Sequence, residues 1–207
     1  MKTNIIVIDD FHSNPDEVRQ FALNQEYPEP YDEYTYPGKN TEVGYYPEEL
    51  HQKFENILQS KLTPSQPNGY FRLSLETDTF RQDVHVDPCW EWGAVCYLNT
   101  PEQAIDEGGT SFWIHNKTQM EFCPSNQPEA NHFGYSVPKE AWWTTIYGEG
   151  LDRSKWTRYF LSPMKYNRLV IFNTRLWHSH NYNFGTTLEN GRLVQLFFFN
   201  PVEWWYE

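Results

Sequence analysis

The hydrophobic pattern of the chain changes its period near Tyr70, and this change constrains the fold more than any other feature. Before Tyr70, apolar residues recur at helical spacing; after it, they alternate with polar residues as in half-buried strands. We expect strands at 70–76, 92–99, 110–115, 168–173 and 192–199. Helices first and strands afterwards predict a mainly β (α+β) fold, in which a sheet closes or folds on itself and is backed by helices.

The segment before Tyr70 predicts one strand and two helices. The apolar run at residues 4–8 indicates a short buried strand. A helix is expected after the cap residues Ser13 and Asn14, with Pro15 in its first turn. A second helix begins near Pro47, and its apolar residues at helical spacing are Leu50, Phe54, Ile57, Leu58 and Leu62. Residues 27–46 lie between the helices, are rich in Tyr, Pro and Gly, and predict a long covering loop.

A length of 207 residues favours one domain, spanning 1–207. We divide it into an N-terminal strand and helices over 1–66 and a β core over 67–200. Within the core, residues 116–166 are polar, aromatic and irregular, and they predict an excursion from the sheets with a short helix near Asp152–Trp156. Excursions of this kind often carry substrate contacts.

Composition excludes several classes of function. A formal net charge of -12 opposes general attraction to nucleic acid, which is an unlikely partner. We expect no membrane span and no signal peptide, because apolar runs are short and acidic residues follow early, so the predicted location is cytoplasmic. The cysteines Cys89, Cys96 and Cys123 form no CxxC pair, so we expect reduced thiols in or near the core.

His85 and Asp87 form the strongest local candidate for a metal site. Two positions separate them, so in an extended chain both side chains point to the same side. One neutral nitrogen and one anionic oxygen are two of the three ligands in a 2-His-1-carboxylate iron site. A His-x-Asp motif alone is a weak signal, because a surface His beside an Asp usually has no function.

The sequence that follows this motif adds context. Residues 92–99 read WGAVCYLN, residues 107–112 read EGGTSF, and residues 167–172 read NRLVIF and lead to WHSH at 177–180. This succession resembles the iron(II) and 2-oxoglutarate dioxygenase superfamily, particularly its prolyl-hydroxylase-like branch. VIDDF and NPDEVR near the N-terminus, with GRL at 191–193, also resemble a little-characterised bacterial and phage subgroup of that superfamily.

The resemblance implies a double-stranded β-helix, or cupin-like jelly-roll, with the N-terminal helices packed on the major sheet. It implies that His85, Asp87 and His178 are the catalytic metal ligands, with His180 as the alternative distal ligand. It further implies that Arg192 binds the far carboxylate of 2-oxoglutarate, although Arg192 could also be a solvent-facing strand end. Tyr97 matches a position that often reaches the same carboxylate, or it is an ordinary core Tyr.

The implied cofactors are Fe(II), the co-substrate 2-oxoglutarate and O2. The implied enzyme is a dioxygenase that hydroxylates a C–H bond and releases succinate and CO2. Resemblance to prolyl hydroxylases favours a peptide or protein side chain as substrate over a small molecule. Two alternatives remain at this point: a cupin-type metal-binding protein that does not oxidise 2-oxoglutarate, and a non-catalytic jelly-roll interaction module. The sequence predicts no oligomeric state.

Overall fold

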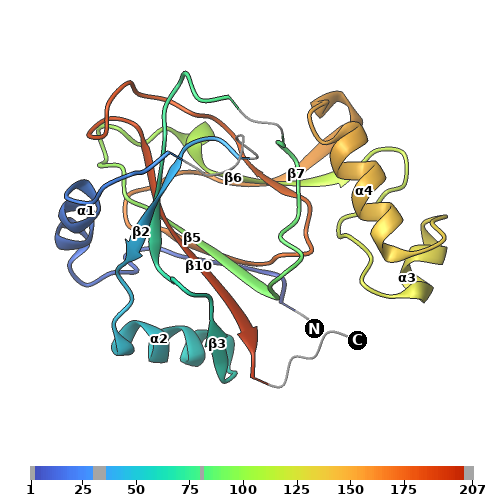
Figure 1. Cartoon of the computed structure of the whole chain (residues 1–207), viewed down its shortest axis with the longest axis horizontal. Helices are drawn as coiled ribbons and strands as arrows, with labels where there is room; N and C mark the ends of the chain where they lie inside the picture. The colour runs from blue at the N-terminus through green and yellow to red at the C-terminus, as the bar shows by residue number, and fades with distance from the viewer. Residues whose placement is uncertain (1–2, 30–35, 80–81, 203–207) are drawn as a thin grey trace.

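The computed structural model describes residues 3–29, 36–79 and 82–202 of the chain. Strands and helices alternate up to about residue 60, and most of the later elements are strands (Figure 1). In chain order they are β1 (Ile5–Ile8), α1 (Pro15–Leu23), β2 (Lys39–Gly44), α2 (Glu48–Leu58), β3 (Leu62–Pro64), β4 (Tyr70–Ser74), β5 (Trp92–Tyr97), η1 (Asp106–Gly108), β6 (Thr110–His115), α3 (Gln127–His132), α4 (Pro138–Glu149), η2 (Arg153–Lys155), β7 (Trp156–Ser162), β8 (Leu169–Asn173), β9 (His178–His180) and β10 (Arg192–Pro201).

Two antiparallel sheets make up the fold. The major sheet has seven strands in the order β1-β8-β5-β10-β4-β2, with β3 paired to β10, and the minor sheet has three strands in the order β7-β6-β9. Strands that are neighbours in a sheet are mostly distant in sequence; β10, for example, pairs with both β4 and β5. This is a double-stranded β-helix, and it confirms the predicted fold.

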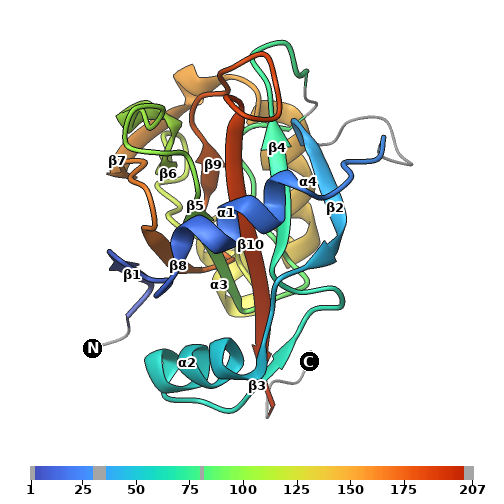
Figure 2. The ribbon, with the colours of Figure 1, turned by 90° about the vertical axis from the view of Figure 1, so that its left-hand side faces the viewer.

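The strands at the centre of the major sheet are buried on both faces, and their alternating side chains enter two different cores. Leu169 and Ile171 of β8 pack in the outer core against α1 and α2, where Phe54 is fully buried. Val170 and Phe172 of the same strand pack in the inner core, toward the minor sheet. Figure 2 shows α1 lying across the outer face of the major sheet. The helices therefore cover one face and leave the space between the sheets for a site.

The N-terminal segment differs from its prediction in three places. β1 was expected to be buried, but it is an edge strand that pairs only with β8 among the described strands, and Val7 is 41% exposed. The expected loop contains β2, which extends the major sheet beside β4. The second helix ends before Gln59, whose φ of 52° is left-handed, and Leu62 therefore lies in β3 rather than in the helix.

The excursion over residues 116–166 is more regular than expected. It contains α3, α4 and β7, and the short helix expected near Asp152–Trp156 is the 3-10 helix η2. α4 packs beside the minor sheet through a third hydrophobic cluster, in which Ile146 meets Trp113, Trp156 and Trp177. No helix in the described part of the chain is long and apolar enough to cross a membrane.

Candidate metal centre and adjoining pockets

The three residues predicted as metal ligands lie together on the wall of a cavity between the sheets. His85 and Asp87 come from the segment before β5, and His178 is the first residue of β9. Reciprocal backbone hydrogen bonds of 2.9 Å join His85 and His178 as an isolated β-bridge. One ligand atom from each of the three residues lies within 4.8 Å of the others. Strand pairing thus brings segments 90 residues apart into one cluster.

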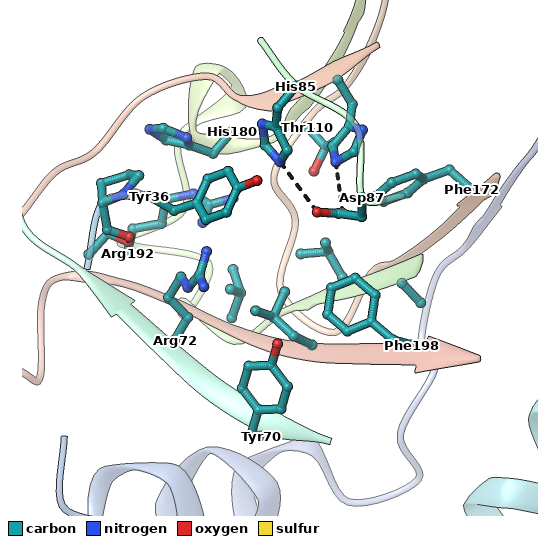
Figure 3. Close-up of a pocket in the computed structure, with 17 residues that line it drawn as sticks. Tyr36, Tyr70, Arg72, His85, Asp87, Thr110, Phe172, His180, Arg192 and Phe198 are labelled. Atoms are coloured by element: carbon teal, nitrogen blue, oxygen red, sulfur yellow. Dashed lines mark hydrogen bonds and ion pairs between the residues drawn. The ribbon is translucent and has the colours of Figure 1, made fainter. Parts of the chain in front are cut away.

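Backbone carbonyl groups fix the orientation of both imidazoles. Nδ1 of His85 lies 2.7 Å from the Asp83 oxygen, and Nδ1 of His178 lies 2.8 Å from the Leu176 oxygen. Because a carbonyl oxygen only accepts, each Nδ1 donates its proton, and in the neutral ring each Nε2 then presents a lone pair. The two Nε2 atoms face the Asp87 carboxylate at 3.9 and 3.2 Å (Figure 3). Three converging acceptors repel one another unless a cation lies between them, so this donor set fits a divalent metal.

The electrostatic environment agrees with that donor set. Burial and the neighbouring His178 lower the pKa of His85 to about 4, so its imidazole is neutral near pH 7. Burial opposes ionisation of Asp87, but its interactions with His178, His85 and Arg72 outweigh burial and lower its pKa. The cluster therefore offers one anionic oxygen, from Asp87, and a neutral imidazole nitrogen from His85 beside that of His178.

His180, the alternative distal histidine, also lines the cavity but is not part of this cluster among the described residues. Burial, together with the positive charge of Arg192, holds the pKa of His180 well below its usual value. The geometry favours His178 over His180 as the third ligand, because His178 lies 3.2 Å from Asp87 and groups with His85 and Asp87.

A cavity of about 170 Å³ extends from the cluster between the sheets, and Arg192 forms part of its wall. The Arg192 side chain is 3% exposed, and its Nε donates to the Gly108 carbonyl oxygen at 2.8 Å. Burial lowers the pKa of Arg192 to about 10, which leaves the guanidinium charged near pH 7. No ion pair among the described residues involves Arg192. A buried cation without a protein carboxylate suits an anionic ligand.

Tyr97 does not line this cavity, although it is fully buried beside it. Its hydroxyl donates to Oγ1 of Thr110 at 2.8 Å, and Thr110 does line the cavity. Since the Thr110 oxygen accepts this bond, its own proton is available to donate toward the cavity. Thr110 therefore lies between Tyr97 and the cavity. Sequence reasoning missed this residue.

Three more cavity residues were missed because nothing local in the sequence marks them. Tyr36, which follows α1, packs against His85 with ring centroids 4.5 Å apart and the rings tilted by 49°. Arg72 and Tyr70 of β4 face the cavity because they lie opposite Val194 and Leu196 of β10 (Figure 3). An amphipathic strand pattern predicts which face such residues share but not what lies across that face.

A second, more open pocket of about 570 Å³ adjoins the first. The two pockets share Tyr70, Asp87 and Phe198, so they meet at the metal cluster. Trp90 of the outer pocket lies 6.3 Å from Phe198 between ring centroids. The outer volume falls within the range of about 300–1,000 Å³ that is usual for organic ligands, whereas the inner volume is smaller.

An arginine outside both pockets ties the ligand-bearing segments together. Arg153 of η2 forms a bidentate pair with the Asp83 carboxylate at 2.6 and 2.9 Å. The same guanidinium donates to the carbonyl oxygens of His180 and Asn181, just after the His178 ligand position. Asp83 is also the residue whose carbonyl oxygen orients His85. Sequence reasoning missed Arg153, because its partners lie 70 and 28 residues away.

Comparison with known proteins supports the fold. A family model described as a family of unknown function, DUF6445, matches residues 1–199. No curated protein matches the chain. Among solved structures, HygX from Streptomyces hygroscopicus with nickel and 2-oxoglutarate bound has a TM-score of 0.56 at 12% identity, covering 99% of this chain and 85% of HygX. SnoK, a non-heme alpha ketoglutarate dependent carbocyclase from nogalamycin biosynthesis, has a TM-score of 0.53 at 11% identity, covering 97% of this chain and 84% of SnoK.

Proposed function

We propose that this chain, which belongs to DUF6445, a family of unknown function, is an iron(II)- and 2-oxoglutarate-dependent dioxygenase. The observation that carries the proposal is the convergence of two Nε2 atoms and one carboxylate on a cavity that also holds a buried guanidinium, which forms no ion pair with any described residue. Two structural neighbours support the same kind of activity: HygX was crystallised with nickel and 2-oxoglutarate, and SnoK is described as a non-heme alpha ketoglutarate dependent carbocyclase. We treat residues 1–207 as one oxygenase domain.

In this proposal His85, Asp87 and His178 hold the iron. Bound iron(II) with 2-oxoglutarate and O2 supplies oxidation of a C–H bond, in which the substrate gains a hydroxyl group and 2-oxoglutarate becomes succinate and CO2. Three protein ligands on one face leave adjacent positions for the small molecules. Asp83 and Leu176 keep each imidazole in the tautomer that presents Nε2, through their carbonyl oxygens.

Arg192 and Thr110 bind the far carboxylate of 2-oxoglutarate in this proposal. The guanidinium offers parallel N–H donors, and the Thr110 hydroxyl offers one more while it accepts from Tyr97. Tyr97 thus acts through Thr110 and positions it. A cupin-type metal protein that does not use 2-oxoglutarate has no need for a buried Arg192 in the cavity, and this residue favours the oxygenase over that alternative.

The finer parts of the proposal concern reaction and substrate. We propose hydroxylation, because Asp87 retains the carboxylate ligand at its position. The sequence resemblance to the prolyl-hydroxylase-like branch favours a peptide or protein side chain, with a small molecule as the alternative. Mass spectrometry of peptide and metabolite pools, incubated with iron(II) and with or without 2-oxoglutarate, tests this choice. The pool in which a molecule gains the mass of one oxygen atom identifies the substrate class.

The test of the proposal is spectroscopic. Anaerobic addition of 2-oxoglutarate to the iron(II)-loaded protein should produce a metal-to-ligand charge-transfer band in visible light. Asp87→Ala should lose the band and the conversion of 2-oxoglutarate to succinate. If the wild type binds iron and gives no band, the protein is a metal-binding cupin and the proposal is wrong; if it binds no metal, the non-catalytic module is correct.

A pair of matched variants tests the third ligand. His178→Ala should lose iron binding, because it removes one of three protein ligands. His180→Ala changes the same residue type two positions away and should keep iron bound. Iron retained by His178→Ala and lost by His180→Ala would reverse the assignment.

A further inference from the structure

Arg72 is a second cation in the inner cavity, and the co-substrate does not account for it. It lies on β4 directly opposite Val194 of β10 and opposite Asn40 of β2. Asn40 accepts a hydrogen bond of 2.7 Å from Arg72 Nε, and the guanidinium lies 5.7 Å from the centre of the Tyr36 ring. Figure 3 shows it directed from β4 into the cavity beneath Tyr36. One edge of the guanidinium is therefore fixed by the protein, and the terminal nitrogens face the cavity.

No carboxylate of the described residues forms an ion pair with Arg72. Arg72 acts electrostatically on Asp87 and Arg192, so it shares one electrostatic environment with the metal cluster and the proposed co-substrate anchor. A cation in such a place raises the energy of the empty pocket, and an anion lowers it.

A count of formal charges tells how many anions the site accepts. Iron(II) contributes two positive charges, Asp87 one negative charge and 2-oxoglutarate two negative charges, and the histidine ligands are neutral. Arg192 then brings the sum to zero. Arg72 adds one positive charge that neither the metal cluster nor the co-substrate balances. The complete site therefore matches a second ligand with one negative charge.

The surroundings of Arg72 describe the rest of that ligand. Aromatic rings line the cavity around it, from Tyr36 on one side to Tyr70 and Phe198 on the other. Tyr70 and Phe198 continue into the outer pocket, where Trp90 adds another ring. A molecule that enters from the outer pocket thus passes Asp87 along an aromatic wall. Flat or apolar groups suit such a wall, and a carboxylate suits the guanidinium fork.

We propose that Arg72 binds the carboxylate of the substrate, and that the substrate is a monoanionic molecule with an aromatic or apolar body. This inference rests on the proposed oxygenase function and names its substrate class. The carboxylate can belong to a free organic acid or to the C-terminal end of a peptide, since the guanidinium recognises the same group in both. In this role Arg72 determines specificity and leaves co-substrate binding to Arg192 and Thr110.

Binding of two matched pairs of probes tests the proposal. Calorimetry on the anaerobic protein loaded with iron(II) and 2-oxoglutarate compares phenylacetate with phenylacetamide, and N-acetylphenylalanine with its amide. Within each pair the body is the same, and the amide replaces the charged carboxylate with a neutral group of similar size. At least one acid should bind about tenfold or more tightly than its amide, as expected for a charge-assisted pair of hydrogen bonds. The pair with the larger ratio identifies a free acid or a peptide end. Equal binding within both pairs, or no binding of any probe, overturns the proposal.

Variants separate Arg72 from the co-substrate site. Arg72→Gln should remove the preference for the acid and leave the Kd of 2-oxoglutarate, read from the charge-transfer band, within about threefold of wild type. Arg72→Lys keeps the charge in the same strand environment and should retain part of the preference, which guards against a folding defect in the first variant. If Arg72→Gln weakens 2-oxoglutarate as much as Arg192→Gln does, Arg72 belongs to the co-substrate site. If wild type gives no band at all, the proposed function has failed instead.

Discussion

Thr110 lies between the buried Tyr97 and the cavity, and its hydroxyl is the group that we propose binds 2-oxoglutarate. The side chain is 3% exposed, accepts from Tyr97 and faces the cavity that holds Arg192. We expect Thr110→Val, which keeps the shape and removes the hydroxyl, to raise the Kd of 2-oxoglutarate about 10- to 100-fold. A hydrogen bond to a charged group contributes about 1.5–3 kcal/mol, and 1.4 kcal/mol corresponds to about tenfold in Kd. Titration of the charge-transfer band measures this.

Tyr97→Phe is the matched control for Thr110→Val. It removes the hydroxyl that donates to Thr110 but leaves the Thr110 donor in place. Its effect on the Kd of 2-oxoglutarate should be clearly smaller. An unchanged Kd in Thr110→Val, or a larger effect in Tyr97→Phe, contradicts the assigned roles.

The single residues that could be predicted from the sequence are those whose signal is local. His85 and Asp87 have chelating spacing within one segment, and the structure brings them to within 3.9 Å. Arg72 and Thr110 could not be found in this way, because their position in the cavity depends on which strands pair across the sheets. Arg72 in isolation is an ordinary polar residue on an alternating strand; only its register with Val194 places it in the cavity.

Two short segments carry the candidate metal ligands, and one guanidinium adds to the His85–His178 backbone bridge that holds them together. Arg153 joins the Asp83 carboxylate to the backbone beyond β9, so it holds the two ligand-bearing segments at a fixed separation. We expect Arg153→Gln to lower iron(II) affinity about 10- to 100-fold, the range usual for residues that orient metal ligands. Competition with a chromophoric chelator measures this affinity. The expected loss of iron(II) affinity arises although His85, Asp87 and His178 are all unchanged in this variant.

Arg168→Gln serves as the control for Arg153→Gln. Arg168 also forms a bidentate pair with an aspartate, Asp9, at 2.6 and 3.1 Å, but it lies away from the ligand segments. Its loss should leave iron affinity within about twofold of wild type. If both variants lose iron equally, general loosening of the fold rather than positioning explains the effect of Arg153.

Among the elements, those with a clear periodic pattern were predicted and those without one were missed. Strand β6 over Thr110–His115 has its predicted bounds, and α1 begins at Pro15 as expected. Helix α4 was missed because its apolar residues do not mark one face: Ile146 is buried, while Trp143 and Tyr147 are 43% and 58% exposed. Aromatic and β-branched residues also favour strands in isolation, and here tertiary packing overrides that preference.

At the scale of the whole molecule, the charge of the inner cavity is opposite in sign to the net charge of the chain. The chain carries a formal charge of -12, yet its inner cavity contains the guanidinium groups of Arg72 and Arg192. Surface charge acts over about 8–10 Å at ordinary salt concentrations, so local cations dominate once an anion has entered the cavity. The overall composition gave no sign of an anion site, because net charge sums over positions that the fold separates.

His12 links three distant parts of the molecule and makes stability depend on pH. Its Nε2 donates to Gln195 of β10 at 2.9 Å, its backbone bonds to Asn167, and burial followed by the charge of Lys53 lowers its pKa from 6.5 to about 4. Between pH 6.5 and 4 the unfolded chain binds a proton that the folded chain does not, so stability falls as pH falls, by about 1.4 kcal/mol per unit.

From pH 7 to pH 5 this residue should account for a loss of about 2 kcal/mol in unfolding free energy. Urea unfolding of wild type and His12→Gln at both pH values measures it, and the variant should lose that much less; an equal pH dependence in both proteins would show that His12 titrates normally.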